Sequence, residues 1–551
     1  MIEDVRARLH ESRTAVAAVF GNRALRRVEL ARPAAALSVS ASNVVFLVVA
    51  FVAGGASGVG TLLVVRTLVI AVAAPLGSLL GDRFPRQAVM AAADVVRAAA
   101  LAAAAVLLSG DPSLVATLVL ATVVALAGSA AAPARGALIP LLARTPEELT
   151  AANVVASTTL NVVSFVGPAT GGVLLALGSP GAGFALSAAA SIASAALVTG
   201  VRVPRERAGE RAAPGRASRF ALAGFRELLV DAPTRLVVGI YSAQMFVSGV
   251  LAVVIVIAAV DMLGAQANTG FLYSAMGAGG LVGAVLALAV PDRRLGRTFA
   301  VALLAWAVPL ALVGAWPALL PALVLLALSG AADSVVDVTG LTLLQRRIPN
   351  EVFARVGGAA GTALLGAATL GNAVAPFLVE AVGPRWSFVV AGLAVPALAP
   401  LWWRPVARLD AVAPAALPAV RSTPLFGTLP LPALEALARS AERVQVGVRE
   451  TVVRQGEPGD RFYLVVDGEV EFAVDGLVVG TASNGDQFGE IALLRDEPRT
   501  ATVTALEDTY LFAVAREDFL SAVRGEAGAL SAAEELAGAR LSRARPAGQL
   551  A

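Results

Sequence analysis

The sequence predicts an all-α polytopic membrane domain of twelve transmembrane helices in two six-helix halves, followed by a C-terminal β-roll or jelly-roll domain with flanking helices. Three observations predict this architecture. Of the 551 residues, 57% are hydrophobic and only 15% are charged, whereas soluble domains carry about 25% charged residues. Apolar stretches of the roughly 20 residues that cross a bilayer follow one another between residues 33 and 404. Beyond residue 449, short strand-like runs alternate with Gly-containing turns.

The twelve apolar stretches divide into two sets of six. Their cores lie near residues 35–54, 59–80, 88–108, 113–133, 152–177, 182–201, 235–259, 269–290, 298–315, 317–341, 357–379 and 386–403. An arginine-rich loop at 204–232 separates the halves, 33–203 and 233–404. RTPEEL at 144–149 is echoed by RIPNEV at 347–352, which indicates a parallel repeat of the kind that builds transporters around a central site.

The distribution of arginine predicts the orientation in the membrane. One set of loops carries Arg83, Arg86, Arg135, Arg144, the run at 202–235, Arg293, Arg294, Arg297, Arg346, Arg347 and Arg355, and the opposite set offers only Arg385. Because positive charge stays inside, both termini are expected to be cytoplasmic. Residues 1–32 lack a long apolar stretch and read as a cytoplasmic amphipathic segment. The Ala-rich, Lys-free composition favours a bacterial plasma membrane protein.

Three absences exclude classes of chemistry. The chain has no Cys, its one histidine is His10, and all 43 basic residues are arginine. Thiolate metal sites, histidine triads and a P-loop lysine are therefore excluded. We expect no metal, no enzymatic activity and no ATP-driven pumping. The net charge of +3 gives no indication of nucleic-acid binding, and the sequence leaves the oligomeric state open.

Charged residues inside the apolar stretches are the candidates for transport. Each charge costs about 2.5–3.5 kcal/mol at mid-bilayer, so these side chains should face protein or a water-filled cavity. Asp333 and Asp337 share one helix face, either as a proton- or cation-coupling pair or as structural acids that pair with arginines. Asp94 and Arg97 have the spacing of a structural ion pair, although Asp94 remains a coupling candidate. Arg66 has no sequence-local partner, which leaves a role in binding an anionic substrate open.

Two motifs resemble those of the major facilitator superfamily, including exporters of the siderophore and drug type. SLLGDRFPRQ at 78–87 is similar to the conserved loop of the superfamily, and the resemblance implies a conformational role for Asp82, Arg83 and Arg86. GPATGG is similar to the antiporter motif of the exporters, in which a Gly-Pro kink allows helices to approach closely. Its residues are Gly167, Pro168, Gly171 and Gly172.

The C-terminal region also carries a specific pattern. Residues 405–423 are Pro- and Ala-rich and predict a semi-extended linker, followed by a domain at 424–526. FGEIALLRDEPRTATV at 488–503 places a glycine, an acid, a short helical turn and an arginine between two strands. Such a segment offers backbone N–H groups and a guanidinium to a phosphate, and a carboxylate to a ribose hydroxyl.

This segment resembles the phosphate-binding cassette of cyclic-nucleotide-binding domains. The resemblance implies that Glu490 takes the ribose 2′-hydroxyl and that Arg499, with Thr500 and the backbone of Gly489–Ala492, holds the cyclic phosphate. It implies a cyclic nucleotide as the ligand, with cAMP favoured over cGMP but the choice between them left open, and a lid helix in the tail at 527–551. The implied ligand-binding residues are Gly489, Glu490, Ile491, Ala492, Arg499, Thr500 and Ala501.

Together these features predict a secondary transporter, a proton-coupled exporter of a small molecule, regulated by a cytoplasmic cyclic nucleotide. The alternative is a membrane-anchored cyclic-nucleotide sensor that signals to a partner protein and transports nothing.

Overall fold

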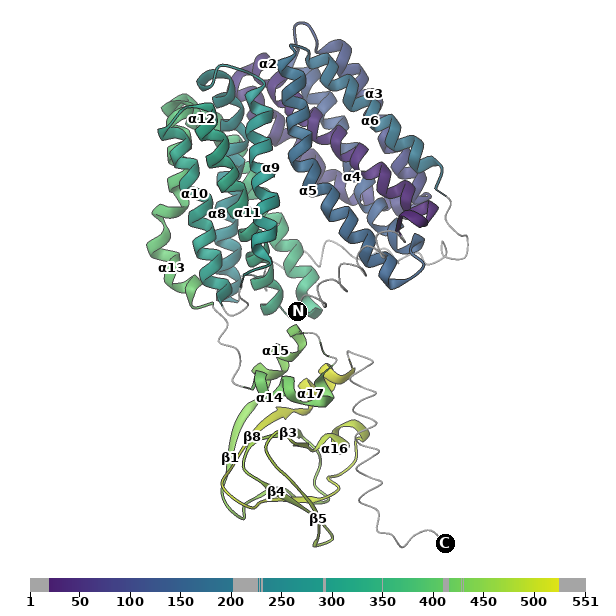
Figure 1. Ribbon diagram of the computed structural model, residues 1–551, viewed down its shortest axis with the longest axis vertical. Helices are drawn as coiled ribbons and strands as arrows, with labels where there is room; N and C mark the ends of the chain where they lie inside the picture. Colours follow the sequence, from purple (N-terminus) through teal and green to yellow (C-terminus); the bar gives the residue numbers. More distant parts are fainter. Residues whose placement is uncertain are drawn as a thin grey trace, which may run out of the picture. The chain divides into compact units, whose positions relative to one another are not determined.

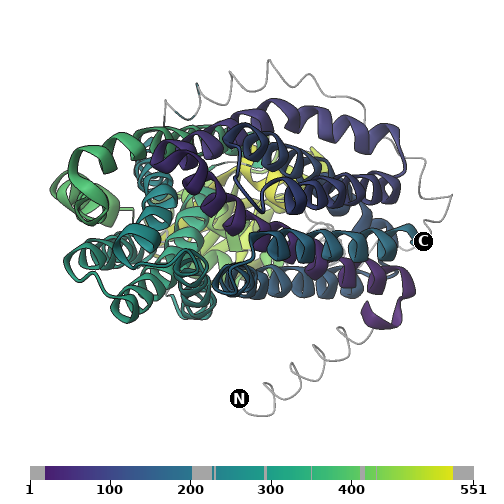
Figure 2. The same ribbon diagram turned by 90° about the horizontal axis from the view of Figure 1, so that it is seen from above.

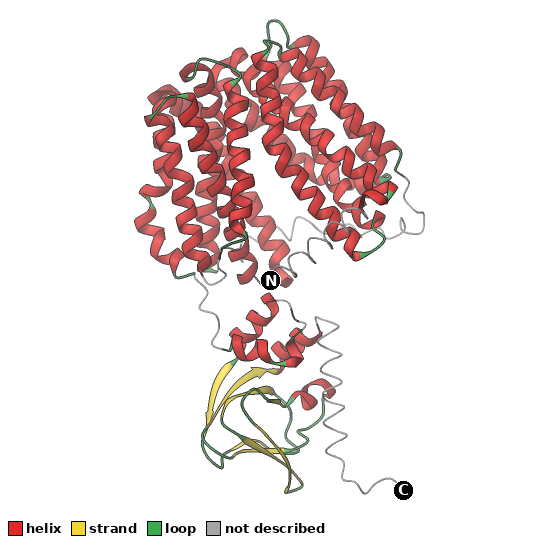
Figure 3. Ribbon diagram, in the orientation of Figure 1, coloured by secondary structure: helices red, strands yellow, loops and turns green. Residues whose placement is uncertain are grey.

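The computed structural model describes residues 19–201, 231–290, 294–348, 350–409, 416–427 and 431–524, together with residues 226, 228 and 429. The chain divides into two compact units, Met1–Asp410 and Ala411–Ala551 (Figure 1). In the described residues the first unit is helical, and the strands all belong to the second unit (Figure 3). The predicted loop at 204–232 lies almost wholly outside the described residues, and the predicted tail at 527–551 lies outside them completely.

In the described residues, the first half of the helical unit consists of five long helices. They are α2 (Arg23–Arg83), α3 (Arg86–Leu107), α4 (Leu114–Leu142), α5 (Pro146–Ala176) and α6 (Pro180–Thr199). Thr145 and Ser179 accept hydrogen bonds from the third residue after them and so cap α5 and α6, and each cap is followed by a proline at the start of the helix. These local signals explain why the helices begin there.

The second half continues the pattern, and the two bundles lie side by side in both views (Figures 1 and 2). Its elements are α8 (Ala232–Ile257), the π-helical turn η2 (Ala258–Met262), α9 (Asn268–Ala287), α10 (Leu295–Ala315), α11 (Leu319–Arg347), α12 (Asn350–Ala397) and α13 (Ala399–Ala407). The echoed sequences at 144–149 and 347–352 occupy equivalent places, between α4 and α5 and between α11 and α12. This correspondence is what a parallel repeat requires.

Two of these helices are broken in their interior. In α2 the break falls at Gly54 and Gly55, and Gly55 has φ +60, a conformation that glycine adopts without steric cost. In α12 it falls at Gly383, with φ +77. Within the described residues, ten helices are long and apolar enough to cross a membrane. Counting both sides of each break gives the predicted number of segments, but the part of α12 after Gly383 is short, so the count of twelve stays a prediction.

The boundaries of the helical unit differ from the predicted ones. Helix α2 begins at Arg23, inside the segment predicted as 1–32, and Leu25 and Val28 are buried against Met90 of α3 and Leu138 of α4. Its turn at Glu29 and Arg32 is held by a buried ion pair of 3.0 Å. At the other end, α13 runs to Ala407, past the predicted boundary at 404. At the N-terminal end, the described part of the predicted amphipathic segment and the first membrane-spanning stretch are therefore one continuous helix up to the break at Gly54.

The second unit is a roll of two four-stranded antiparallel sheets. The strands are β1 (Glu442–Val446), β2 (Thr451–Val453), β3 (Arg461–Asp467), β4 (Val470–Val474), β5 (Leu477–Ala482), β6 (Gln487–Phe488), β7 (Thr502–Ala505) and β8 (Thr509–Ala515). One sheet has the order β1-β8-β3-β6 and the other β2-β7-β4-β5. Alternate residues such as Tyr463, Val465, Phe488 and Leu511 fill the core between them.

Short helices flank the roll. They are α14 (Leu417–Ser422), η4 (Pro424–Phe426), α15 (Leu431–Ser440), α16 (Glu490–Arg495) and α17 (Arg516–Arg524). Phe519 of α17 stacks on Phe462 of β3 with ring centroids 4.8 Å apart, and Phe426 meets Phe462 edge-on at 5.6 Å. Residues 417–422, predicted as semi-extended linker, instead form α14, and Val420 is buried in this aromatic cluster. This part of the linker belongs to the C-terminal core.

Candidate functional sites

A cavity of about 390 Å³ lies between the second sheet and α16. Its walls come from β4, β5, β6, the start of α16 and the segment before β7. All seven residues predicted for cyclic-nucleotide binding line it: Gly489, Glu490, Ile491, Ala492, Arg499, Thr500 and Ala501. Phe472, Val479 and Phe488 supply apolar walls. The cavity thus offers a charged end and an apolar side to one small ligand.

Arg499 forms the charged end of this cavity. Its side chain is only 4% exposed. Nη2 donates to the carbonyl oxygen of Arg461 at 2.7 Å and to the Asp460 carboxylate at 3.2 Å, and Nη1 donates to the carbonyl oxygen of Gly489 at 3.2 Å. The Arg499 N–H donates to the Glu457 carbonyl at 2.8 Å, so both backbone and side chain are fixed. A buried guanidinium held in this way is preorganised for an anion.

Gly489 and Glu490 form the turn that leads into α16. Gly489 adopts φ +93, and a Cβ at this position would lie 2.6 Å from Nη1 of Arg499. Glycine is therefore required twice over, by backbone conformation and by space. Glu490 begins α16 and is 1% exposed. The two opposite charges, Arg499 and Glu490, face one cavity from different segments.

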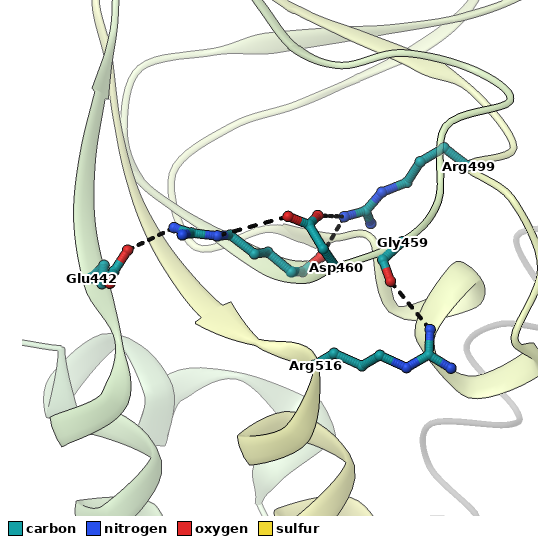
Figure 4. A network of polar contacts seen from close by, with 6 residues as sticks. Glu442, Gly459, Asp460, Arg499 and Arg516 are labelled. Atoms are coloured by element: carbon teal, nitrogen blue, oxygen red, sulfur yellow. Dashed lines mark hydrogen bonds and ion pairs between the residues drawn. The ribbon is translucent and has the colours of Figure 1, made fainter.

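Asp460 links this arginine to the domain surface. Figure 4 shows its carboxylate beside Arg499, and a second ion pair joins it to Arg461 at 3.9 Å. Arg461 in turn donates to Glu442 of β1 at 2.6 Å, and this hydrogen bond raises the pKa of Arg461. Burial, with a smaller contribution from the Asp460 charge, raises the pKa of Tyr463. Our sequence reasoning missed Asp460, because no local pattern connects it to Arg499 in the folded chain.

In the helical unit, the two acids of α11 contact neutral side chains of α8. Nε2 of Gln244 donates to Asp333 at 2.7 Å, and the Tyr241 hydroxyl donates to Asp337. Gln244 itself is fully buried. These two hydrogen bonds join the acids to neutral side chains and not to arginines, which was the predicted alternative. Since amide and hydroxyl partners leave the charge of each carboxylate uncompensated, the pair keeps the features expected of a coupling site.

Asp94 and Arg97 form the predicted ion pair. Nη1 of Arg97 lies 2.7 Å from Asp94, and both side chains are buried. The Ser194 hydroxyl of α6 donates to the second carboxylate oxygen of Asp94 at 2.6 Å. Both oxygens of this acid therefore have partners, which favours a structural role that ties α3 to α6.

Arg66 and Arg135 line a second cavity, of about 630 Å³, within the first half. Nη1 of Arg66 donates to the side-chain oxygen of Asn43, a neutral partner on the same helix before its break. The assignment of Arg135 to a cytoplasmic loop is wrong. It lies inside α4, where its side chain reaches the cavity. The sequence did not reveal this because α4 continues to Leu142, past the expected end at 133.

The glycines of the GPATGG segment pack on two neighbouring helices. A Cβ on Gly167 would lie 2.4 Å from the Cβ of Ser40, and one on Gly171 would lie 2.9 Å from the Ala41 carbonyl, both in α2. Gly172 faces α9 instead, where a Cβ would lie 2.9 Å from the Ala267 carbonyl oxygen. Pro168 lies inside the continuous helix α5. The segment therefore holds α5 against both halves.

The motif at 78–87, predicted as a loop, instead spans the last turns of α2 and the start of α3, and its side chains are only partly described. The Asp82 side chain lies outside the described residues. Arg83 is exposed, and Nη1 of Arg86 donates to the Ala137 carbonyl of α4 at 2.8 Å. Arg86 thus connects the start of α3 to the end of α4. Among the residues that the structure describes, no group of His, Cys, Asp and Glu is arranged to hold a metal ion.

The fold defines a polytopic helical membrane protein joined to a β-roll with a ligand-sized cavity. Comparison with protein families agrees: the profile of the Major Facilitator Superfamily matches residues 33–364, and that of the cyclic nucleotide-binding domain matches residues 443–526. The chain belongs to the Major Facilitator Superfamily, and it carries a cyclic nucleotide-binding domain at its C-terminal end.

The curated relatives match this second domain. The cAMP-dependent protein kinase regulatory subunit of Yarrowia lipolytica is 38% identical over 95 residues, which are 17% of this chain and 25% of the relative. That of Dictyostelium discoideum is 42% identical over 91 residues, 15% of this chain and 28% of the relative. A structure of the regulatory domain of Toxoplasma gondii PKA with cAMP has 30% identity, covers 19% of this chain and 42% of that one, and has a TM-score of 0.19. The chain thus spans about a quarter of the length of these curated relatives.

Proposed function

We propose that this protein is a secondary transporter that exports a small molecule and that a cyclic nucleotide, cAMP in preference to cGMP, regulates it. We propose that the transporter comprises the predicted residues 33–404 together with the first turns of α2 and the end of α13, and that the nucleotide-binding domain comprises the predicted residues 424–526 together with α14. We place the protein in a bacterial plasma membrane with both termini cytoplasmic, because the arginine-rich loops all lie on one side.

The observation that carries the regulatory part is the cavity at Arg499. A cyclic phosphate placed there would meet the preorganised guanidinium and the backbone N–H groups of Gly489–Ala492, and the ribose 2′-hydroxyl would donate to Glu490. The apolar side formed by Phe472, Val479 and Phe488 would receive the base. A cavity of about 390 Å³ is within the range of small-ligand sites, roughly 300–1,000 Å³.

The pair Asp333 and Asp337 supports coupling to protons or another cation. The two acids lie one turn apart on α11, in a stretch of the helix that carries no other charged residue between Leu319 and Gln345. Gln244 and Tyr241 hold the two carboxylates in position by hydrogen bonds but do not neutralise their negative charges. Acids within membrane helices are functional by default. Protonation from one side of the membrane, followed by release to the other, would couple a proton gradient to export.

The alternative, a sensor that transports nothing, would need the helices only as an anchor. The close packing of Gly172 against α9 and the presence of a cavity between α2, α3, α4 and α5 with arginines in its wall favour transport. An anchor requires neither a tight contact between its halves nor a cavity with arginine in its walls.

A proton-flux assay tests this function. Full-length protein is reconstituted in liposomes that contain a pH-sensitive dye, and candidate compounds are added with and without an imposed pH gradient. We expect compound-driven proton movement in the wild type, its loss in Asp333→Asn and Asp337→Asn, and no loss in Asp111→Asn, an exposed acid between α3 and α4. Binding of cAMP without any compound-driven flux would favour the sensor. Unchanged proton-driven flux in the double Asn variant would leave both acids a structural role.

A further inference from the structure

The cavity that Arg66 and Arg135 line in the helical unit is unusual in its charge. It measures about 630 Å³ and is enclosed by α2, α3, α4 and α5. Most of its wall is apolar, with Phe46, Ile70 and Leu160 among the lining residues. Three arginines, Arg66, Arg97 and Arg135, also line it, and no aspartate or glutamate does among the lining residues that the structure describes.

Among the residues that the structure describes, one of these arginines, Arg97, forms an ion pair. Arg97 lies 2.7 Å from Asp94, whose charge it cancels. Arg66 bonds to the uncharged amide of Asn43. The buried Nε of Arg135 has no hydrogen-bond partner among the described residues. The two acids whose charges act on Arg135, Asp94 and Glu29, are already paired with Arg97 at 2.7 Å and with Arg32 at 3.0 Å. Within the described part of the chain, Arg66 and Arg135 therefore have no ion-pair partner at this cavity.

Leaving a guanidinium uncompensated among apolar side chains is unfavourable, so such groups are retained where they bind something. A bound anion would compensate these charges. Each guanidinium has several N–H donors in one plane, and this arrangement matches the oxygens of a carboxylate or phosphate. The apolar wall favours a ligand that carries a hydrophobic body beside its charge. A cation would be repelled by Arg66 and Arg135 together.

We propose that this cavity binds an amphiphilic organic anion, with one or two acidic groups on an apolar body, and that such anions are the substrate class of the transporter. The proposal rests on the proposed transport function and names its substrate chemistry. A soluble metabolite and an anionic lipid headgroup share this chemistry, so the experiment must separate them.

Equilibrium binding to full-length protein in phosphatidylcholine nanodiscs tests the proposal. The probes share one aromatic body: naphthalene-2,6-dicarboxylate, 2-naphthoate, the dimethyl ester of the diacid, and the cation 2-(aminomethyl)naphthalene. We expect the dicarboxylate to bind most tightly and the ester and the cation to bind least. Arg66→Gln and Arg135→Gln should each weaken dicarboxylate binding roughly 10- to 100-fold, because a hydrogen bond to a charged group is lost.

Matched variants separate charge from folding. Arg404→Gln removes an exposed arginine of α13 that does not line the cavity, and dicarboxylate affinity should not change. Arg135→Lys keeps the charge and should retain part of the affinity. Ala125→Phe keeps every arginine but fills the cavity, so binding should fall although the charge is intact. Each variant is scored only if its thermal transition is cooperative, and Arg135→Lys and Ala125→Phe keep the test decisive if a Gln variant does not fold.

Nanodiscs that contain phosphatidylglycerol separate the two sources of the anion. Undiminished dicarboxylate affinity there supports a soluble anion. If phosphatidylglycerol instead lowers the dicarboxylate affinity of the wild type, and this competition disappears in the Arg66→Gln and Arg135→Gln variants, the cavity binds a lipid headgroup and the substrate role is overturned. Equal binding of diacid, ester and amine, or unchanged binding in the double Gln variant, would overturn the proposal itself. Transport of a neutral or cationic compound without dicarboxylate binding contradicts only this inference, whereas arginine-dependent binding without any transport contradicts only the proposed function.

Discussion

The Arg499 guanidinium and the Asp460 carboxylate lie 3.2 Å apart, yet they occupy different environments. The Arg499 side chain is 4% exposed and the Asp460 side chain 72%. The pair therefore runs from the interior of the nucleotide cavity to solvent. Arg499 also keeps two carbonyl partners, Gly489 and Arg461, that do not depend on this acid. Its position is consequently set mainly by backbone groups, and its charge remains available to a ligand.

Arg499→Ala should abolish tight binding of cyclic nucleotide. The variant leaves the cyclic phosphate without its guanidinium in a partly buried cavity, a loss of about 2–5 kcal/mol, or at least about thirtyfold in affinity. Calorimetric titration of full-length protein with cAMP and with cGMP measures it. Arg516→Gln is the matched control, because this arginine contacts the Gly459 carbonyl and Asp496 and does not line the cavity. Equal, tight binding by the wild type and Arg499→Ala would remove the site assignment.

Asp460→Asn should change nucleotide affinity much less, by under about fivefold. An ion pair with a well-exposed partner is worth about 0–1 kcal/mol, and the carbonyl contacts to Arg499 remain. The same titration measures this variant. A loss as large as that of Arg499→Ala would show that Asp460, and not the backbone, positions the guanidinium.

The sequence predicted the elements whose signals are local. The glycine, acid and arginine at 489, 490 and 499 lie within one short segment, and the structure brings them to one cavity. The ion pair of Asp94 and Arg97 follows from i,i+3 geometry and is confirmed at 2.7 Å. By contrast, β1 lies before residue 449, where the strand-like runs were predicted to begin, because residues 442–444 follow almost directly on α15 with no turn signal between them. The strand β6 has only two residues, too few to give a strand pattern in the sequence.

Contacts between distant residues were beyond the reach of the sequence. Tyr241 meets Asp337, and Gln244 meets Asp333, only because α8 packs beside α11 in a particular register. Asp460 reaches Arg499 from a turn 39 positions earlier in the chain. A single sequence carries periodicity and local propensity but not the rotation of one helix against another. These contacts determine which charges of the candidate sites are compensated by a partner.

Arg97→Gln should destabilise the protein, whereas Arg135→Gln should not. Removing Arg97 leaves the buried Asp94 with Ser194 as its remaining hydrogen-bond partner in the described structure, and breaking a buried pair costs about 3–5 kcal/mol. Removing Arg135 eliminates an uncompensated charge, so the empty protein should be as stable as the wild type or more stable. Thermal unfolding in detergent, without added anion, compares the two. A similar loss in both variants would contradict the different charge environments inferred for them.

Gly270→Ala should disturb the contact between the two halves. A Cβ on Gly270 of α9 would lie 2.4 Å from the Pro168 carbonyl oxygen and 2.5 Å from the Cα of Gly172. These are backbone atoms that move only if the helices separate, and overpacking costs about 1–3 kcal/mol. The thermal midpoint should fall. Gly239→Ala of α8 is the control, since a Cβ there meets nothing within 4 Å. An unchanged midpoint in Gly270→Ala would show that α5 and α9 pack less closely than described.

Regulation by the nucleotide should be reciprocal with transport. A ligand shifts a conformational equilibrium only by its differential affinity for the two states, typically 1–3 kcal/mol or about 5- to 150-fold. If cAMP alters the balance between inward- and outward-open states, a transported compound must alter cAMP affinity by the same factor, whichever sign the effect has. We expect the cAMP affinity measured at saturating compound to change by the same factor by which cAMP changes the affinity for the compound.

Deletion of residues 411–551, the second compact unit, should leave flux that no longer responds to the nucleotide. The Arg499→Ala variant should behave like this deletion at nucleotide concentrations that saturate the wild type. If the full-length protein transports at one rate with and without cAMP, and compound leaves cAMP affinity unchanged, the domain does not regulate transport.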